Sequence, residues 1–422
     1  MKASQARSVG VGPAENRRKP IILFVIALLM AFGNLNVAPA QTATVLAAAG
    51  GTGACTDITA YGGSPANPDN RAALAAALNA SAGGGACVSF PPGQFTFAGN
   101  FKFVMPNGNA SITLTGAGAD VTQLYWPTGG GLTIEYVGAD NSVHLRNVSL
   151  TTGSTGIGSA LVLNQTNGDV DAADNALNDL VDVTIRGADG YSQNDYWDRA
   201  VEINQISNVN LVGLVISGPG GAAYSNRGVG VVLEGSSNNP AVVFNVTGGS
   251  FNYLSKGIVY GQQVQGLSVS QSNFVGDDYG IYVPPNISGL DQLTVAGSQF
   301  NCATGGIYVG SSLSNTLFSA NLFIVPNTGR GIYLQQAYLY SAVGNSFNIG
   351  SSAKGSDYPI GIEAGSTAGG GTIIGNLFDN MVTAIMLDRS STGANVQSNE
   401  YSNDSTKVKN LGTGNIVGGG TP

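Results

Sequence analysis

Short runs of apolar residues recur along most of the chain, and each run follows polar or small residues and ends on one large apolar anchor. The intervals between successive anchors lie between 23 and 35 residues, and no helical periodicity runs through them. The anchors are Leu150, Ile185, Ile216, Phe251, Phe274, Phe300, Phe323, Phe347, Phe378 and Tyr401. A repeat of this length, made of short β runs, predicts one turn of a β-solenoid per repeat.

A second pattern follows the anchors. A Gly-Ile or Ala-Ile pair occurs after each of six anchors, six residues later in four of them, as at Gly257-Ile258 and Gly280-Ile281. Longer spacings indicate loops inserted at fixed corners of the coil. The aromatic anchors are expected to stack in the interior. Asparagines two residues before the anchors are expected to take the left-handed conformation of a corner and to form a hydrogen-bonded ladder; they are Asn321, Asn345, Asn376 and Asn399.

One short helix is expected before the repeats. Leu74 and Leu78 lie four residues apart among alanines, and Asp69 or Asn70 precedes them as a candidate N-cap. Such a helix can cover the open end of a solenoid. The predicted fold is therefore an all-β, single-stranded right-handed parallel β-helix of 12–13 coils with a short N-terminal capping helix. The repeat region is expected to span 111–422, after a capping segment and first coil at 41–110.

The first forty residues have the pattern of a secretory signal peptide. Arg17, Arg18 and Lys19 precede an apolar run over residues 21–32, and Ala38-Pro39-Ala40 forms a small-residue cleavage pattern. Because about 12 strongly apolar residues are short for a bilayer core of ~30 Å, an export signal at 1–40 is favoured over a membrane anchor. The expected location is secreted, periplasmic or at the cell surface, without stable membrane insertion after cleavage.

Composition and charge narrow the partners. The chain has 62 glycines, 10% charged residues and one histidine, which excludes any site that needs two histidines. Without residues 1–40 it keeps 12 basic and 24 acidic residues, a formal net charge of −12. This balance argues against a nucleic-acid partner. Cys55 and Cys87 are candidates for a disulfide that would leave Cys302 free, although the sequence does not settle this pairing.

Residues 55–97 are similar to the opening segment of pectate-lyase-superfamily and tailspike-type β-helix proteins. The match includes the alanine-rich helix, a glycine turn and Phe90-Pro91-Pro92-Gly93, and it departs at Tyr61-Gly62-Gly63-Ser64. Further on, the run 276–281 resembles the "GDDC-x-A" coil of polygalacturonases, and 304–311 resembles their "GHGISIGS". The resemblance implies a pectin-lyase-like β-helix. The polygalacturonase histidine is replaced by Gly305, and Leu254-Ser255-Lys256-Gly257 occupies the position of "NTDG".

Aligning the coils on the Gly-Ile pairs predicts three stripes on one side of the β-helix. A polar stripe contains Asp198 and Asp278, and an adjacent stripe begins with the three cations Arg199, Arg227 and Lys256. A third stripe starts at Glu202 and continues as the aromatic series Tyr282, Tyr308 and Tyr333. Tyr196 and Trp197, in the preceding loop, are candidates for stacking on sugar rings.

Two interpretations of the cations remain open. They either bind an acidic glycan or are neutralised by neighbouring acids, namely Asp195, Asp198, Glu202 and Glu234. The candidate substrate-binding residues are Arg199, Asp198, Glu202, Tyr196, Trp197, Tyr282 and Tyr308. The candidate catalytic residues are Asp278, Asp277, Lys256 and Arg227, since a lyase needs a base and a cation that neutralises the uronate carboxylate.

Two hypotheses for function follow. The first is a secreted carbohydrate-active protein that binds and cleaves an acidic polysaccharide, as a lyase or a hydrolase; the second is a non-catalytic surface, adhesive or structural β-helix. No cofactor or metal is expected. The oxygen-rich run 167–174 is only loosely suited to calcium, and a solvated loop is the favoured interpretation there. His144, in a strand-like run, is interpreted as structural. The substrate and the oligomeric state are not encoded in any recognisable pattern.

Overall fold

The computed structural model describes residues 55–80, 85–106, 108–138, 140–166, 176–221, 223–224, 227–349 and 357–418. The predicted signal peptide at 1–40 and the oxygen-rich run at 167–174 lie outside these residues. The chain divides into two compact units, Met1–Thr52 and Gly53–Pro422, and the description below concerns the second. Within the described ranges, no helix has the length and apolar character needed to cross a bilayer.

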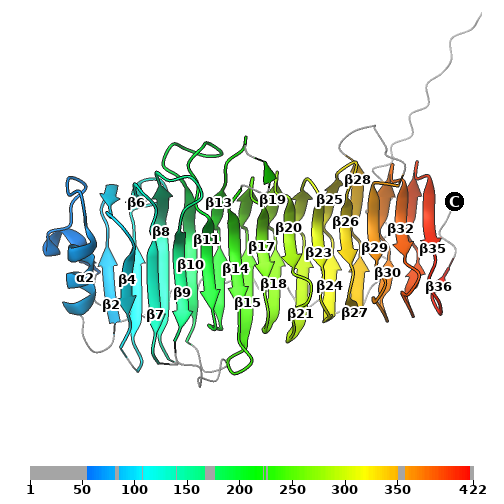
Figure 1. The fold of residues 1–422 in the computed structure, drawn as a ribbon, viewed down its shortest axis with the longest axis horizontal. Coiled ribbons are helices and arrows are strands. Elements are labelled where there is room, and N and C mark those ends of the chain that lie inside the picture. Colours follow the sequence, from blue (N-terminus) through cyan, green and yellow to red (C-terminus); the bar gives the residue numbers. More distant parts are fainter. Residues whose placement is uncertain are drawn as a thin grey trace, which may run out of the picture. The chain divides into compact units, whose positions relative to one another are not determined.

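Each coil of the second unit consists of three short strands that pair in parallel with the same strands of the next coil (Figure 1). One coil is formed by β18 (Val264–Ser270), β19 (Asn273–Val275) and β20 (Tyr279–Val283). The first two strands of each coil belong to a 24-stranded sheet, sheet A, and the third belongs to a 12-stranded sheet, sheet B. Together with the comparisons given below, this topology confirms the predicted right-handed parallel β-helix.

The strands of sheet B are β4 (Phe101–Val104), β7 (Leu132–Tyr136), β9 (Ser159–Gln165), β11 (Arg199–Asn204), β14 (Val229–Glu234), β17 (Lys256–Tyr260), β20, β23 (Gly305–Val309), β26 (Arg330–Leu334), β29 (Ile360–Ala364), β32 (Thr383–Leu387) and β35 (Thr406–Asn410).

Sheet A contains two series. The first strands of the coils, with the short β1 at their N-terminal edge, are β1 (Thr56–Asp57), β2 (Gly85–Ser89), β5 (Ser111–Thr115), β8 (Ser142–Thr152), β10 (Asn178–Gly187), β12 (Val209–Val212), β15 (Ala241–Thr247), β18, β21 (Leu290–Ala296), β24 (Leu313–Ser319), β27 (Ala337–Val343), β30 (Thr372–Ile374), β33 (Asn395–Gln397) and β36 (Ile416–Val417). The second strands are β3 (Gly93–Thr96), β6 (Thr122–Trp126), β13 (Val215–Ser217), β16 (Ser250–Asn252), β19, β22 (Gln299–Asn301), β25 (Leu322–Val325), β28 (Ser346–Ile349), β31 (Leu377–Asp379) and β34 (Glu400–Ser402); β8 and β10 continue through both positions.

The predicted interior stack of aromatic anchors is present. Phe251, Phe274, Phe300, Phe323, Phe347 and Phe378 are buried and stack with centroid distances of 4.7–4.9 Å and interplanar angles of 3–8°. We call these six residues the phenylalanine ladder. Tyr401 stacks on the last ring at 5.7 Å. The centroid spacing equals the spacing of parallel strands in a sheet, so each coil contributes one ring to a continuous core.

The Gly-Ile pairs are explained by this ladder. A Cβ atom on Gly306 would lie 2.7 Å from the ring of Phe323, and the glycines at the same position of four other coils face the neighbouring phenylalanine at 2.6 Å. The isoleucine that follows, for example Ile307, is buried among the core residues. The glycine is therefore required because a phenylalanine ring of the next coil occupies the space of a side chain.

The predicted asparagine ladder is also confirmed, with one correction. The Nδ2 atom of Asn345 donates to Oδ1 of Asn376 at 2.9 Å, and the same contact joins the other pairs of the series at 3.0 Å. Each Oδ1 also accepts a backbone N–H from the preceding coil. The left-handed conformation belongs to the residue before each asparagine, as at Ala320 (φ 54°) and Gly344 (φ 66°), and the asparagines themselves are not left-handed. The asparagine is selected for its hydrogen bonds.

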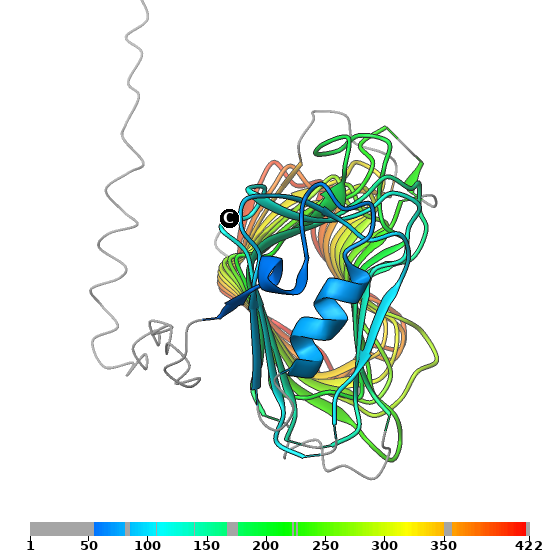
Figure 2. The same cartoon turned by 90° about the vertical axis from the view of Figure 1, so that its left-hand side faces the viewer.

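The N-terminal end of the coil is covered as predicted. Helix α2 (Arg71–Ala80) lies across the interior at this end (Figure 2), with Leu74 and Leu78 buried. Asp69 Oδ1 accepts from the N–H of Arg71 at 3.1 Å, while the carbonyl of Asn70 accepts from Leu74. A 3-10 helix, η2 (Ile58–Tyr61), packs beside α2 and buries Ile58.

The cysteines take one of the arrangements considered from the sequence. Cys55 and Cys87 form a disulfide, and Cys302 is free and buried. The disulfide ties the residue before β1 to β2, next to the capping helix, so it reinforces the end of the coil where the core would otherwise open.

Candidate functional site

Four tyrosines form a connected surface on the outer face of sheet B. Tyr282, Tyr308 and Tyr333 are register partners on β20, β23 and β26, and Tyr279 lies on β20 beside Tyr282. Because side chains alternate across a strand, each of the three partners faces outward while the preceding isoleucine faces the core. This arrangement confirms the predicted aromatic series, and we call these four residues the tyrosine ladder.

The rings of the tyrosine ladder touch without a regular stack. Tyr282 and Tyr308 have centroids 5.0 Å apart and nearly parallel planes, whereas Tyr308 and Tyr333 are 5.4 Å apart and tilted by 53°. Tyr279 is tilted against both Tyr282 and Tyr308. All four rings are half-buried. The ladder therefore offers aromatic surface to solvent at about one ring per coil.

Burial is the main influence on the hydroxyl groups. It raises the pKa of Tyr279 to about 12, with the nearby Asp278 carboxylate adding to the effect. Burial also raises the pKa values of Tyr282, Tyr308 and Tyr333 above 10. The hydroxyl of Tyr308 donates to Oε1 of Gln335 at 2.6 Å. At neutral pH the ladder therefore presents neutral phenols that donate and accept hydrogen bonds.

Two cations flank the ladder. At one end, the Lys256 ammonium lies 4.9 Å from the centroid of the Tyr282 ring, and in the described part of the chain no carboxylate oxygen comes within 4.0 Å of it. At the other end, the Arg330 guanidinium lies 4.3 Å from the Tyr333 ring and forms a short ion pair with Glu363. Both contacts are cation–π geometries. Of these two cations, only the arginine forms an ion pair within the described residues.

The predicted column of three consecutive cations is wrong. In the register of sheet B, Arg199 pairs with Val229, and Val229 pairs with Lys256. Arg227 lies two residues before Val229, in the loop that enters β14. Arg227 directly precedes Gly228, but Gly230 and Val231 are the residues that occupy the Gly-Ile position of this coil. The cation in register with Lys256 on the far side of the ladder is Arg330.

Arg199 is neutralised by neighbouring acids, which was the second interpretation of the cations. Its Nη1 donates to Glu202 Oε2 at 2.9 Å, and its Nε lies 3.9 Å from Asp198 Oδ2. Glu202 also accepts from the hydroxyl of Ser159. The three predicted binding residues Asp198, Arg199 and Glu202 are thus together, but they form a closed ion-pair cluster on β11, two coils before Lys256.

The two aromatic residues of the loop before β11, predicted to stack on sugar rings, have different environments. Trp197 is buried, its ring contacts Trp126 edge to face at 5.8 Å, and Nε1 donates to the carbonyl of Leu150. It therefore belongs to the core, and a sugar at the surface does not reach it. Tyr196 is half-buried and bonded through its backbone to Gly156 and Ser154.

The two adjacent aspartates have different environments. Asp277 is fully buried, and its Oδ1 accepts from the N–H of Leu254 at 2.7 Å. Asp404 likewise accepts from the N–H of Met381, which lies 23 residues earlier. A carboxyl group at this position therefore stabilises the corner of the coil. Burial raises the pKa of Asp277 well above its usual range. Asp278 instead accepts from the hydroxyl of Thr304, beside the tyrosine ladder. Of the predicted catalytic carboxyls, only Asp278 is accessible.

Arg227 is engaged by backbone carbonyls. Its Nη1 donates to Gly276 at 2.6 Å and its Nη2 donates to Gly220 at 3.1 Å, while the guanidinium lies 4.1 Å from the ring centroid of Tyr224 and 5.7 Å from that of Tyr253. These contacts hold the loop before β14 against the next coils. Arg227 therefore lies in the loop before β14, whereas Lys256 lies on strand β17 of sheet B.

Sequence reasoning missed Arg330, Glu363 and Tyr358. Arg330 directly precedes Gly331-Ile332, so continuing the cationic series by three more coils beyond Lys256 would have identified it. Glu363 follows Tyr333 in register. Tyr358, whose hydroxyl accepts from Arg330 at 3.0 Å, lies in an inserted loop for which no repeat position exists.

His144 is structural in the described residues. Its Nδ1 lies 2.7 Å from Asp179, which also binds Arg146. Although burial alone would raise the pKa of Asp179, the hydrogen bonds from His144 and Arg146 hold it below its usual value.

Comparison with known proteins supports the fold. The family model described as "Periplasmic copper-binding protein (NosD)" matches residues 212–417, just under half of the chain. No curated protein sequence matches significantly. Among solved structures, the chain is similar to the surface adhesin PfbA of Streptococcus pneumoniae, with a TM-score of 0.52 and 12% identity over 85% of this chain and 91% of that one.

Two further solved structures that resemble this chain are proteins of other kinds than the adhesin. Tailspike protein 3 of bacteriophage CBA120 has a TM-score of 0.54 and 13% identity, over 87% of this chain and 62% of the tailspike. The family 28 exopolygalacturonase of Yersinia enterocolitica has a TM-score of 0.52 and 10% identity, over 87% of this chain and 79% of the enzyme. Identities this low establish the fold, and functions as different as these share it.

Copper, the metal named in the description of the family model, does not fit the residues that the structure describes. Copper sites use histidine, cysteine and methionine ligands. Among the described residues, two of the three cysteines form the disulfide, the histidine is bound to Asp179, and Met105 and Met381 are buried in the core. The described residues contain no cluster of three or more His, Cys, Asp or Glu side chains able to hold a metal ion. What the topology and the comparisons establish together is that the chain has a right-handed parallel β-helix fold.

Proposed function

We propose that the protein binds an acidic polysaccharide outside the cytoplasm, along the tyrosine ladder of sheet B. The observation that carries this proposal is the row of outward tyrosines with the Lys256 ammonium at one end and no acid within ion-pairing distance among the described residues. Aromatic rings match the apolar faces of sugar rings, and their hydroxyl groups meet the polar rim. The proposed partner of the lysine is a carboxylate of the glycan.

The location rests on separate support. The Cys55–Cys87 disulfide is of the kind that persists in oxidising compartments. The N-terminal sequence pattern, which lies outside the described residues, is that of an export signal. The net negative charge of the chain means that binding depends on the local site and not on general attraction to anions.

Binding is tested with polygalacturonate and alginate, with neutral dextran as the comparison. We expect saturable binding of an acidic polymer, weakened about tenfold by Tyr308→Ala, which removes ~1.4 kcal/mol of contact. Lys256→Ala should also weaken binding and reduce its dependence on salt. Tyr338→Ala is the control, because Tyr338 is an exposed tyrosine on the outer face of sheet A. Absence of binding to every acidic polymer, or equal loss in the control, contradicts the proposal.

Cleavage of the bound chain is a second candidate. Lys256 is the register partner of Tyr279, and the accessible Asp278 directly precedes Tyr279. In a β-elimination, a base takes the proton at C5 of a uronate while the C4–O bond breaks, and a cation stabilises the carboxylate. Lys256 and Asp278 are the residues proposed to divide these roles.

The product distinguishes the two candidates, because elimination creates an unsaturated uronate that absorbs near 235 nm. Cleavage predicts a rise in absorbance that Lys256→Ala and Asp278→Asn abolish while Tyr338→Ala leaves it intact. Binding without any rise in absorbance, and without new reducing ends, limits the function to recognition.

A further inference from the structure

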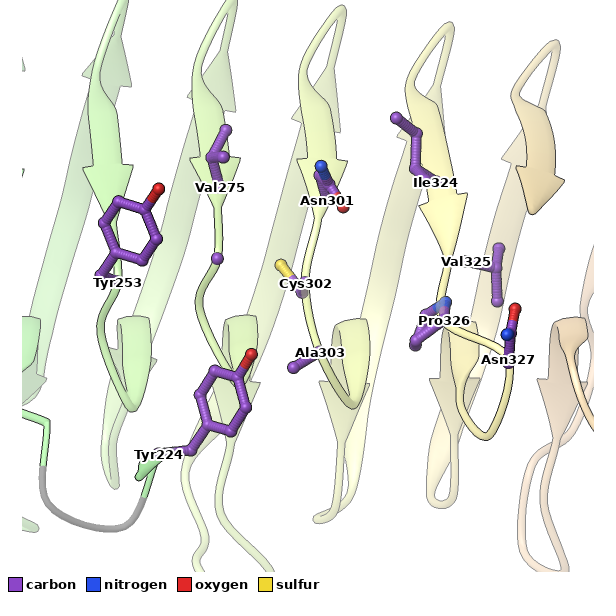
Figure 3. Close-up of a pocket in the computed structure, with 11 residues that line it drawn as sticks. Tyr224, Tyr253, Val275, Asn301, Cys302, Ala303, Ile324, Val325, Pro326 and Asn327 are labelled. Carbon is purple, nitrogen blue, oxygen red and sulfur yellow. The ribbon is translucent and has the colours of Figure 1, made fainter. Parts of the chain in front are cut away.

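A hollow lies on the other side of the corner from the tyrosine ladder. It crosses the ends of β16, β19, β22 and β25, on the outer side of sheet A, and has a volume of about 430 Å³. In Figure 3, Tyr253 and Tyr224 stand on one side, Pro326 and Asn327 on the other, and Cys302 and Asn301 lie between them. Its residues belong to different elements from those of the ladder, so it is a separate site.

The aromatic side of this hollow is held in place. The Arg227 guanidinium contacts both tyrosine rings while its two nitrogens are fixed by the carbonyls of Gly276 and Gly220. Gly276 has a φ of +71°, and a Cβ there would lie 2.7 Å from the Tyr253 ring. Glycine therefore both permits the turn and lets the ring lie against the backbone. Two rings fixed in this way lose little freedom when a ligand packs on them.

The residues at the base of the hollow and on the side opposite the tyrosines determine which kind of ligand fits. Val275, Ile324, Val325 and Pro326 contribute apolar surface, whereas the amide of Asn301 is exposed and offers a donor and an acceptor. Cys302 is buried at the base, and burial raises the pKa of its thiol well above its usual value, so it is a neutral wall and not a nucleophile. Among the described residues, no acidic or basic side chain lines the hollow.

From these features we infer that the hollow is a binding site for a neutral glycosyl residue, distinct from the acidic chain assigned to the ladder. The volume lies in the range of small-molecule sites, about 300–1,000 Å³, at the end suited to a single sugar ring or a pair. The tyrosine faces take the apolar side of the ring and the Asn301 amide takes its hydroxyl groups. The Arg227 guanidinium is engaged by the carbonyls of Gly276 and Gly220 and by the tyrosine rings, so a uronate carboxylate in the hollow would lose water without gaining an ion pair.

Arg227 acts in this site as a positioning residue. It reaches the ligand only through the two tyrosines. A lysine there would keep the charge but could not bind two carbonyls in one plane while stacking on a ring. Arg227→Lys should therefore weaken sugar binding while the ladder keeps its affinity for polymers.

The test uses the intact chain and four neutral probes, glucose, galactose, mannose and N-acetylglucosamine, with galacturonic acid as the charged comparison. Saturation-transfer NMR and calorimetry should show saturable binding of at least one neutral probe and weaker binding of the acid. Tyr253→Ala should weaken the binding about tenfold, and Asn301→Ala about threefold. Because Asn301 is exposed, its variant keeps the fold even if Tyr253→Ala does not. Tyr308→Ala should leave binding of the neutral probe unchanged.

Failure of all four neutral probes to bind overturns the inference. Binding that survives both Tyr253→Ala and Asn301→Ala, or that is stronger for galacturonic acid, also overturns it. Neither result depends on whether the ladder binds a polymer.

Discussion

Two aromatic ladders run along the same coils, and they differ in regularity. The phenylalanine ladder inside has interplanar angles of 3–8°, whereas neighbouring rings of the tyrosine ladder on the outer face of sheet B make angles of 20–53°. Both repeat once per coil. The interior rings are regular because close packing leaves them one arrangement, while the half-buried exterior rings have fewer neighbours to fix their orientation. The same residue class therefore stabilises the fold on one side and offers a contact surface on the other.

The difference teaches how a repeat can carry function. Interior positions must repeat, since each ring occupies the space that a glycine of the preceding coil leaves free. Exterior positions are under no such constraint: the column that contains the tyrosine ladder begins with Lys102 and Thr133 and ends with Met386 and Lys409. A residue type that repeats on the outer face, such as the three tyrosines in register, is therefore more informative about function than a residue type that repeats in the interior.

Phe300→Ala should have the largest effect on stability. Removing a fully packed ring between Phe274 and Phe323 is expected to cost about 3–5 kcal/mol of unfolding free energy. Chemical denaturation followed by circular dichroism measures it. Phe300→Leu is the control and should lose less, because it fills part of the cavity. A loss below ~1 kcal/mol for the alanine variant would show that the interior stack is not what holds the coils together.

Gly306→Ala tests the same ladder from the opposite side. The added methyl must displace the ring of Phe323 or the backbone beneath it, which is expected to cost about 1–3 kcal/mol. Gly221→Ala is a suitable control, since a Cβ there meets no atom within 4 Å and the residue does not have a positive φ. Equal melting temperatures for the two variants would contradict the role given to the glycine of the Gly-Ile pair.

Tyr308→Ala should separate the two ladders. We expect unfolding free energy to fall by no more than about 1 kcal/mol, since the ring is half-buried, while affinity for an acidic polysaccharide falls about tenfold. The pair of measurements is denaturation and calorimetric titration on the same sample. A large loss of stability with unchanged affinity would assign the exterior tyrosines to folding and not to binding.

The smallest expected effect is a pH dependence. The folded pKa of Tyr279 is about 12 and the unfolded value is 10, so the folded state holds the proton more tightly. Its contribution to stability is fully present below pH 10 and is lost as the pH rises towards 12. After allowance for solvent screening of a half-buried ring, the loss is about 1 kcal/mol. Phenolate absorbance near 295 nm, compared with Tyr279→Phe, measures it. A Tyr279 titration near pH 10 would contradict the burial argument.

The fold was largely predictable because its signals are periodic. The phenylalanine anchors, the Gly-Ile pairs and the asparagines each mark one position of the coil, and three independent patterns with the same period leave few alternatives. The register failed at Arg227, where Gly228 and Gly230 both satisfy the glycine pattern and only strand pairing distinguishes them. A misplacement of two residues was enough to create a false cationic column.

The site was less predictable, since most exterior positions are free to change from one coil to the next. Tyr282 and Tyr308 were found through their register, but the orientation of Trp197 depends on an inserted loop, and it turns into the core to meet Trp126. The sequence did not show which of the adjacent residues Asp277 and Asp278 would be buried. The hollow beside Tyr253 has no sequence signal at all, because it joins the ends of four strands with a loop whose length is irregular.

The dependence of affinity on chain length tests the central claim most directly. Lys256 and the tyrosine ladder occupy four successive strands, β17, β20, β23 and β26, which span ~14 Å at ~4.8 Å per strand. Calorimetric titration with acidic oligosaccharides of increasing length should therefore show affinity that rises up to about four sugar units and then levels off, and Tyr308→Ala should lower this plateau. Affinity that does not change with length, or no binding at any length, would contradict the account.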